Sequence, residues 1–242
     1  MFNRKVICNL GLNDIKNMME EQFDCKVDSM DFKDMKIIYD VYIELQDGIN
    51  NYRDKRVQKF VCEDKSIHHV IFHAIPIDAF LRSRIDYKKA ITSLNNKQFL
   101  IASYGSDFEG LHGEGTSSHN RLFRNGIFEV VKEYKNRGKV NVNNPKIKFK
   151  EFVTESLEVY SELGISSPIV YFVTFANVEG QEMATKNGDF DTTITERNIL
   201  NPAGVAIKDN GQIDNEVHNI FVPIVNDFGI NDYYTFDEST GN

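Results

Sequence analysis

The chain has 242 residues, of which 41% are hydrophobic, 26% charged and 12% aromatic, with no tryptophan. These proportions exclude wholesale disorder and fibrous repeats, and a chain of this length buries a sizeable core in one large domain, with or without an extension. The 28 basic and 36 acidic residues give a net charge of −8, which argues against a protein coated in positive charge to hold nucleic acid. A local basic face is compatible with that total.

The cysteines and the apolar runs indicate the compartment. Cys8, Cys25 and Cys62 are an odd number at wide spacing, so neither a disulfide framework nor a zinc site is expected. We expect a cytoplasmic protein with no metal and no cofactor. No apolar run approaches the roughly 18–20 residues that span a bilayer, and Asn9 and Asp14 interrupt any signal-peptide core, so no membrane association is expected.

The N-terminal third is expected to be mainly helical before its first clear strand. A short strand is predicted over residues 6–10 and a helix over 14–22. Apolar residues at helical spacing then predict a long helix over 37–60. Beyond it the period becomes strand-like over 68–75, and Pro76 ends that strand.

The middle of the chain contains the strongest turn signals. Residues 81–94 predict a loop with a short helix, and residues 98–103 another strand. Four glycines between residues 105 and 118 indicate a loop. Asn125-Gly126 then separates two apolar runs, which predicts a hairpin with a type I′ turn, because both central residues of that turn need positive φ.

The C-terminal part is predicted to supply a helix and the central strand. An amphipathic helix is expected over 149–163, with Gly164 at its end. The β-branched and aromatic run over 169–175 predicts a central strand. Two further strands are predicted at residues 204–208 and 219–225. Residues 179–201 are expected to form an exposed loop, and residues 227–242 an acidic tail.

These elements predict the α+β class: a mostly antiparallel mixed sheet, packed by an amphipathic helix, with an N-terminal helical segment. The strands do not alternate with helices, so a doubly wound parallel sheet is disfavoured. We expect a helical segment over residues 1–64, the α+β domain over 65–226 and a disordered acidic tail over 227–242.

Two groups of histidines invite a catalytic or metal interpretation. On a strand, His69 and His73 lie about 13 Å apart and His68 faces the other way, so a structural role is favoured over metal binding. His112 and His119 flank the glycine-rich segment with its acidic residues, which is compatible with general acid–base chemistry. The segment contains no nucleotide-binding glycine motif, so a surface loop is favoured.

The basic residues are concentrated in one stretch. Residues 132–150 contain seven basic residues and one acidic residue, whereas residues 176–242 contain twelve acidic and three basic ones. Two interpretations stay open for the basic stretch: a solvated connection, or a contact for a nucleic-acid backbone with Tyr134 and Phe149 available for stacking. The candidate nucleic-acid contacts are Arg121, Arg124, Lys132, Lys135, Arg137, Lys139, Lys146, Lys148 and Lys150.

Three segments carry a resemblance to a known family: His69-Val-Ile-Phe-His-Ala-Ile-Pro-Ile-Asp-Ala-Phe80, Ser106-Asp-Phe-Glu-Gly-Leu111 and Asn120-Arg-Leu-Phe-Arg-Asn-Gly-Ile-Phe-Glu129. In this order they resemble the region that follows the AlbA-like Schlafen domain in bacterial ATP- or DNA-binding proteins. In that family a long Arg- and Glu-rich helix precedes the motifs, and Tyr52-Arg53-Asp54-Lys55-Arg56 is similar to part of it. The resemblance implies a fold and an association with a nucleic-acid-binding system.

The family's nucleic-acid- or nucleotide-binding domain precedes this region, and the roughly 40 residues before Asp40 are too few to form it. The resemblance therefore assigns that domain's activity to no residue of this chain. A fragment, a partner protein and a stand-alone accessory domain all stay open. The expected function is a non-catalytic interaction or regulatory module, acting with a nucleic-acid-binding partner or neighbouring domain. The alternative is a metal-dependent nuclease or nucleotide hydrolase that uses His112, His119 and the acids between them.

Overall fold

A computed structural model describes residues 32–61, 66–80, 84–95, 97, 105–115, 118–135, 138–165, 168–184 and 193–230. The expected strands at 6–10 and 98–103 and the expected helix at 14–22 lie outside these residues. The same is true of most of the acidic tail. The described part has the predicted α+β architecture, with helices packed on a mostly antiparallel sheet.

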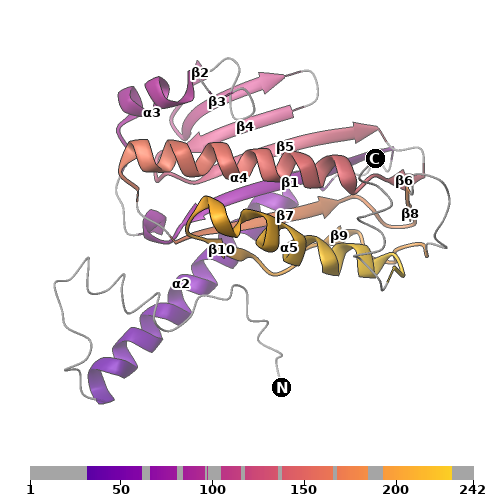
Figure 1. Ribbon diagram of the computed structural model, residues 1–242, viewed down its shortest axis with the longest axis horizontal. Helices are drawn as coiled ribbons and strands as arrows, with labels where there is room; N and C mark the ends of the chain where they lie inside the picture. Colours follow the sequence, from indigo (N-terminus) through magenta and orange to yellow (C-terminus); the bar gives the residue numbers. More distant parts are fainter. Residues whose placement is uncertain are drawn as a thin grey trace.

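The predicted long helix is α2, Phe32–Gln58. It begins before the expected residue 37 and continues through Gly48, which does not split it into two helices. In Figure 1 the first half of α2 extends away from the sheet, and its C-terminal half crosses one face of the sheet. Leu45, Ile49 and Val57 are the hydrophobic residues of the described part of this helix that are buried in that contact.

The main sheet has eight strands, and its order is β10-β7-β1-β5-β4-β3-β2, with β9 also paired to β7. All of its neighbouring strands are antiparallel. The residues 169–175 that were predicted to form a central strand lie in β7, between β10 and β1, so this prediction is confirmed. The strands are β1 (Ile67–Pro76), β2 (Gly105–Ser106), β3 (Gly110–Gly115), β4 (Ser118–Phe123), β5 (Phe128–Lys135), β7 (Ile169–Ala176), β9 (Ile199–Leu200) and β10 (Val205–Ile207).

The other elements of the described residues are helices and a second, two-stranded sheet. A separate parallel pair joins β6 to β8. The remaining elements are η2 (Ile77–Phe80), α3 (Tyr87–Leu94), β6 (Lys139–Val140), α4 (Asn143–Leu163), β8 (Glu182–Met183), η3 (Asn210–Gln212) and α5 (Ile213–Asp227).

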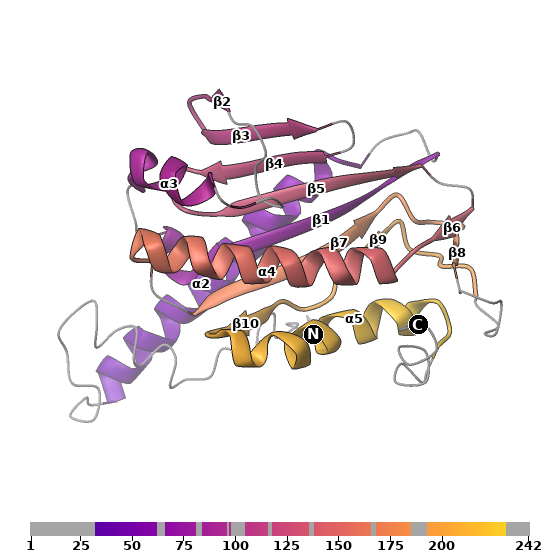
Figure 2. The ribbon, with the colours of Figure 1, turned by 45° about the horizontal axis from the view of Figure 1, so that its top comes forward.

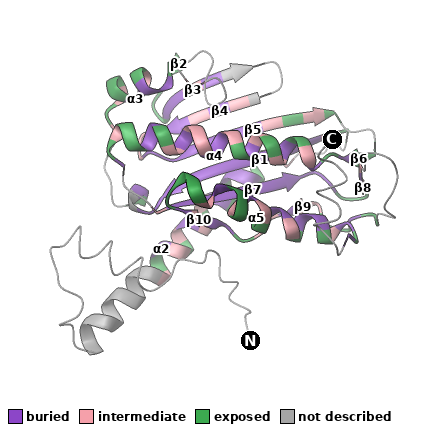
Figure 3. Ribbon diagram, in the orientation of Figure 1, coloured by how far each residue is buried: buried purple, intermediate pink, exposed green. Residues whose placement is uncertain are grey.

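Helices cover both faces of the sheet. Figure 2 shows α4 and α5 side by side on one face and α2 on the opposite face. The larger core lies under α4 and α5, where Phe72 of β1 contacts Phe149 and Phe152 of α4 at ring-centroid distances of 5.3 and 5.7 Å. Because β1 and β7 are covered on both sides, nearly all their residues are buried, as the purple central strands in Figure 3 show.

The predicted hairpin is confirmed, but its predicted type I′ turn is wrong. The loop has three residues, Arg124 to Gly126, and the amide of Gly126 donates to the carbonyl of Phe123. Of these three loop residues, only Gly126 has a positive φ, of 92°. A four-residue turn followed by a left-handed glycine bulge is the usual three-residue hairpin loop. The Asn-Gly pair therefore predicted the hairpin correctly, but the turn has a different backbone geometry from the predicted one.

Two other sequence predictions need correction. Glycine-rich residues 105–106 and 110–115 form β2 and β3 instead of a loop, because pairing of β2 with β3 and of β3 with β4 satisfies their backbone groups. Residues 219–225 form part of α5 instead of a strand. Over the longer window, the buried residues of α5 recur at helical spacing, which outweighs the β-branched composition of the short run: they are Ile213, Val217, Ile220, Phe221, Ile224 and Val225.

We expect the substitution Gly110→Ala to destabilise the fold by about 2 kcal/mol or more. A Cβ on Gly110 would lie 2.2 Å from the carbonyl oxygen of Leu122, so the backbones of β3 and β4 would have to separate. Urea unfolding measures the effect. The control is Gly48→Ala in α2, where the added Cβ would lie 4.0 Å from the Phe80 ring, and there we expect a gain of roughly 0.5–1 kcal/mol. Equal stabilities of the two variants would contradict the close approach of β3 to β4.

Candidate nucleic-acid interface

A buried group of charged side chains attaches α2 to the sheet. Nε of Arg56 donates to Oε2 of Glu129 at 2.7 Å, and Nη2 of Arg56 donates to Oε1 of the same carboxylate. His73 of β1 lies with Nε2 3.1 Å from Oε2. The side chains of Glu129 and His73 are completely buried. Burial opposes ionisation of Glu129, but the hydrogen bonds from Arg56 and His73 outweigh it and lower the pKa of Glu129 to about 2.

Two aromatic side chains, Tyr52 of α2 and Phe123 of β4, pack beside this group. The Arg56 guanidinium lies 4.9 Å from the centre of the Phe123 ring, and Tyr52 packs edge-on against the same ring at 5.9 Å. The Tyr52 hydroxyl has no hydrogen-bond partner among the described residues. Burial and the nearby Glu129 carboxylate raise the pKa of Tyr52. The hydroxyl therefore stays protonated and can donate a hydrogen bond.

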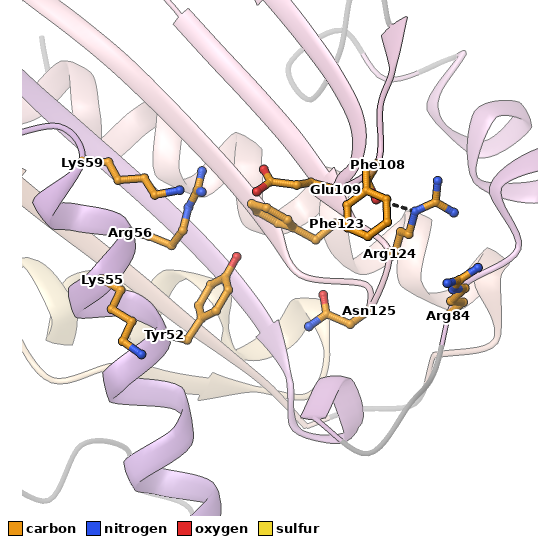
Figure 4. A pocket seen from close by; sticks show the side chains of 10 residues that line it. All are labelled: Tyr52, Lys55, Arg56, Lys59, Arg84, Phe108, Glu109, Phe123, Arg124 and Asn125. Carbon is orange, nitrogen blue, oxygen red and sulfur yellow. Dashed lines mark hydrogen bonds between the residues drawn. The ribbon is translucent and has the colours of Figure 1, made fainter.

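Beside these side chains lies an open pocket of about 520 Å³, drawn in Figure 4. α2 forms one wall, and the segments around Phe108 and the β4–β5 turn form the other. The two walls are distant in sequence. They meet because α2 directly precedes β1 in the chain, and β1 is paired with β5, which begins at this turn. The lining residues are Tyr52, Lys55, Arg56, Lys59, Arg84, Phe108, Glu109, Phe123, Arg124 and Asn125.

The pocket has an excess of positive charge. Five of its lining residues are basic and one is acidic. Arg56 is neutralised by Glu129, and Arg124 donates to the backbone carbonyls of Phe108 and Asp107 at 2.7 and 3.2 Å. Within the described ranges no carboxylate forms an ion pair with Lys55, Lys59 or Arg84. These three cations are available to an anionic ligand.

The exposed aromatic ring of Phe108 lies at the rim of the pocket, in a turn whose backbone is hydrogen-bonded. The Phe108 side chain is 88% exposed, the largest exposure among the large hydrophobic residues of the described chain. Its backbone is nevertheless held, because Oδ1 of Asp107 accepts from the amides of Glu109 and Gly110 at 2.8 and 2.9 Å. Arg124 fastens the same turn through the Phe108 carbonyl. A rigidly presented, solvated ring is suited to stacking on a planar ligand.

Of the described residues that were predicted from sequence to contact nucleic acid, Arg124 alone lines this pocket. Arg124 lines the pocket, and Arg121 lies next to it, bonded to Asp107 and Glu109. The other described candidates lie on β5, β6 and α4, and Arg137 lies outside the described residues. Several are ion-paired: Lys139 with Glu182, Lys148 with Glu151, and Lys150 with Asp214.

The remaining candidates are Lys132, Lys135 and Lys146. Burial, and then the charge of Lys148, lower the pKa of Lys132, which indicates that these two lysines lie close together on the α4 side. Lys135 is exposed at the end of β5, and Lys146 lies in the first turn of α4. The stretch of residues 132–150 is therefore not one loop. It includes the end of β5, the short strand β6 and the first part of α4.

Sequence reasoning missed Lys55, Lys59, Arg84 and Phe108. A signal did exist for the two lysines, because residues four apart on a helix share a face. For Phe108 the signal was an aromatic residue between two acids in a glycine-rich turn. No sequence signal places Arg84 near α2.

The histidines occupy separate environments. His68 stacks on Tyr134 at a ring distance of 5.3 Å, and burial lowers its pKa to about 4. His112 has Nδ1 3.6 Å from Oδ2 of Asp107, while the ring of His119 lies 6.4 Å from that of Phe60. Among the described residues there is no group of three or more His, Cys, Asp or Glu side chains that could hold a metal ion.

Comparison with known proteins identifies no relative: no family model, no curated protein and no solved structure matches the chain. The described residues form an α+β fold that has a basic pocket with an aromatic rim on the α2 face of the sheet. None of the helices in the described ranges has the length and apolar character required to cross a membrane.

Proposed function

We propose that the protein is a non-catalytic interaction module that binds single-stranded nucleic acid through the pocket between α2 and the β4–β5 turn. The observation that carries the proposal is the combination of three cations without a carboxylate partner among the described residues, Lys55, Lys59 and Arg84, with the exposed ring of Phe108. Proteins that bind single strands combine a positive groove for the phosphates with aromatic rings on which the bases stack.

The net charge of −8 does not oppose this proposal at short range. At physiological salt, charges separated by more than about 8 Å are largely screened, so a ligand in the pocket responds mainly to the local cations. The resemblance to the Schlafen-associated region adds support. Two of its three motifs contain pocket residues, Phe108 and Glu109 in one, and Phe123, Arg124 and Asn125 in the other. The proposed role is to act with a nucleic-acid-binding partner or neighbouring domain.

Charge reversal tests the proposal. We expect Lys55→Glu/Lys59→Glu to weaken binding of a fluorescent single-stranded oligonucleotide by about tenfold or more, measured by anisotropy, because contacts to phosphates supply most of such affinity. Phe108→Ala is expected to weaken it by a similar factor through lost stacking. If two phosphates are neutralised, the slope of log K against log salt should be about −1.4.

The matched control is the triple charge reversal of Lys146, Lys148 and Lys150, the lysines of α4 that sequence analysis put forward. We expect it to leave affinity for the single strand almost unchanged. Loss of binding in the triple variant alone would move the interface to α4 and contradict the pocket. Absence of binding by the wild-type protein at low salt would contradict the proposed function.

The same samples test the hydrolase alternative. Oligonucleotide and ATP are incubated with the protein and with a divalent metal, and products are separated by electrophoresis and chromatography. Turnover that is lost in His119→Ala would replace the non-catalytic module by an enzyme. We expect no turnover, because Asp107, whose carboxylate lies 3.6 Å from His112, is already paired with Arg121 at 3.0 Å.

A further inference from the structure

Glu109 is the acidic residue among the pocket residues, and its orientation is fixed. Nη1 of Arg121 donates to its Oε2 at 2.6 Å, and Arg121 is itself held by Asp107 at 3.0 Å. Oε1 of Glu109 has no hydrogen-bond partner in the described part of the chain, and the side chain is 51% exposed. In Figure 4 it lies between Phe108 and Phe123, with its carboxylate toward α2. A negative group in this place disfavours a phosphate there and offers an acceptor instead.

Hydrogen-bond donors lie in the same pocket. Oδ1 of Asn125 accepts from the amide of Ile127 at 3.4 Å, which leaves the Asn125 amide nitrogen to face a ligand. The hydroxyl of Tyr52 is a second donor, and it is buried without a partner among the described residues. Both line the hollow that contains Glu109. The centre of the pocket is thus equipped to bind a polar, uncharged, planar group.

The cations lie around this centre. Lys55 and Lys59 lie on the α2 side, and Arg84 lies on the opposite side beside Arg124 (Figure 4). A nucleotide within a strand has a phosphate on the 5′ side and another on the 3′ side of its sugar, and the base extends from the same sugar. The arrangement matches a base at the centre and phosphates at the two basic walls.

We propose, building on the function proposed above, that the pocket reads this base and prefers guanine. Guanine presents two adjacent donors, N1–H and the N2 amino group, which a single carboxylate accepts together, and its O6 accepts from Asn125 or Tyr52. Adenine and cytosine place a ring-nitrogen acceptor beside their amino group, and thymine and uracil place carbonyls on both sides of one N–H. Those acceptors would face the Glu109 carboxylate and repel it.

The test compares oligothymidylate with the same strand carrying one guanine, one adenine or one inosine at its centre. We expect the guanine strand to bind the wild-type protein about tenfold more tightly than the others, because a good two-bond base contact discriminates by at least that factor. Inosine, which lacks the N2 amino group, should lose most of this advantage. The inosine comparison changes only the ligand, so it does not depend on the folding of a variant.

Glu109→Gln should reduce the guanine preference to about twofold or less, because an amide presents one acceptor and one donor to the two donors of guanine. The matched control is Glu182→Gln, an exposed carboxylate that pairs with Lys139 outside the pocket. It should keep the full preference. Equal binding of all strands by the wild-type protein would overturn the guanine preference and leave nucleic-acid binding in place, whereas no binding of any strand would overturn the function on which it rests.

Discussion

Replacing Arg56 by leucine is expected to lower the free energy of unfolding by about 3–5 kcal/mol. The substitution leaves the completely buried Glu129 carboxylate without its two strongest hydrogen bonds, with only His73 as a partner. An uncompensated buried charge costs far more than the lost attraction of the pair. Urea or guanidinium denaturation followed by circular dichroism measures the change.

Arg53 provides a matched control on the same helix. Arg53 and Arg56 are 7% and 8% exposed, and each guanidinium lies over a phenylalanine ring. The ion-pair partner of Arg53 is Asp54, whose side chain is 59% exposed and can be solvated after the substitution. We expect Arg53→Leu to cost about 1 kcal/mol. A loss in Arg53→Leu as large as in Arg56→Leu would show that packing, and not the buried carboxylate, sets the cost.

Acid is expected to destabilise the fold in two steps. His68 has a pKa of about 4 in the folded protein against 6.5 ordinarily, so the unfolded chain binds more protons between these values and stability falls as pH drops from 6.5 to 4. Glu129 has a pKa of about 2 against 4.5 ordinarily, and its contribution is lost as pH falls from 4.5 toward 2. Each full step corresponds to about 3 kcal/mol.

The substitution His68→Phe isolates the first step, because phenylalanine can keep the stacking on Tyr134 and does not titrate. Unfolding free energies of the wild type and the variant are compared from pH 7 to 4.5. We expect the variant's curve to be flatter; His69, whose pKa burial also lowers, contributes the remaining slope. Parallel curves for the two proteins would be inconsistent with a buried, neutral His68.

Local patterns correctly predicted the longer strands and two of the helices of the described chain. The apolar residues of α2, the β-prone run of β7 and the Asn-Gly pair of the β4–β5 hairpin each produce their structure through nearby residues, so a short window was sufficient. The same window misled over residues 219–225, where a β-branched composition concealed the helical spacing of α5. It also misled over residues 105–115, whose glycines lie in β2 and β3, because glycine composition suggested a loop and concealed the pairing of β2 with β3 and of β3 with β4.

The candidate site was decided by the tertiary structure. By itself the sequence determined which residues carry charge, that Lys55 and Lys59 share a helical face, and that Arg124 lies in a turn. Only pairing of β1 with β5, and the Arg56–Glu129 contact across 73 residues, brings α2 to the turn that presents Phe108 and Glu109. Such contacts depend on which surfaces are buried together, and a pattern of neighbouring residues does not encode that choice. For this reason the basic stretch at 132–150 stood out in the sequence, whereas the pocket cations, which have no carboxylate partner in the described ranges, became evident only in the folded chain.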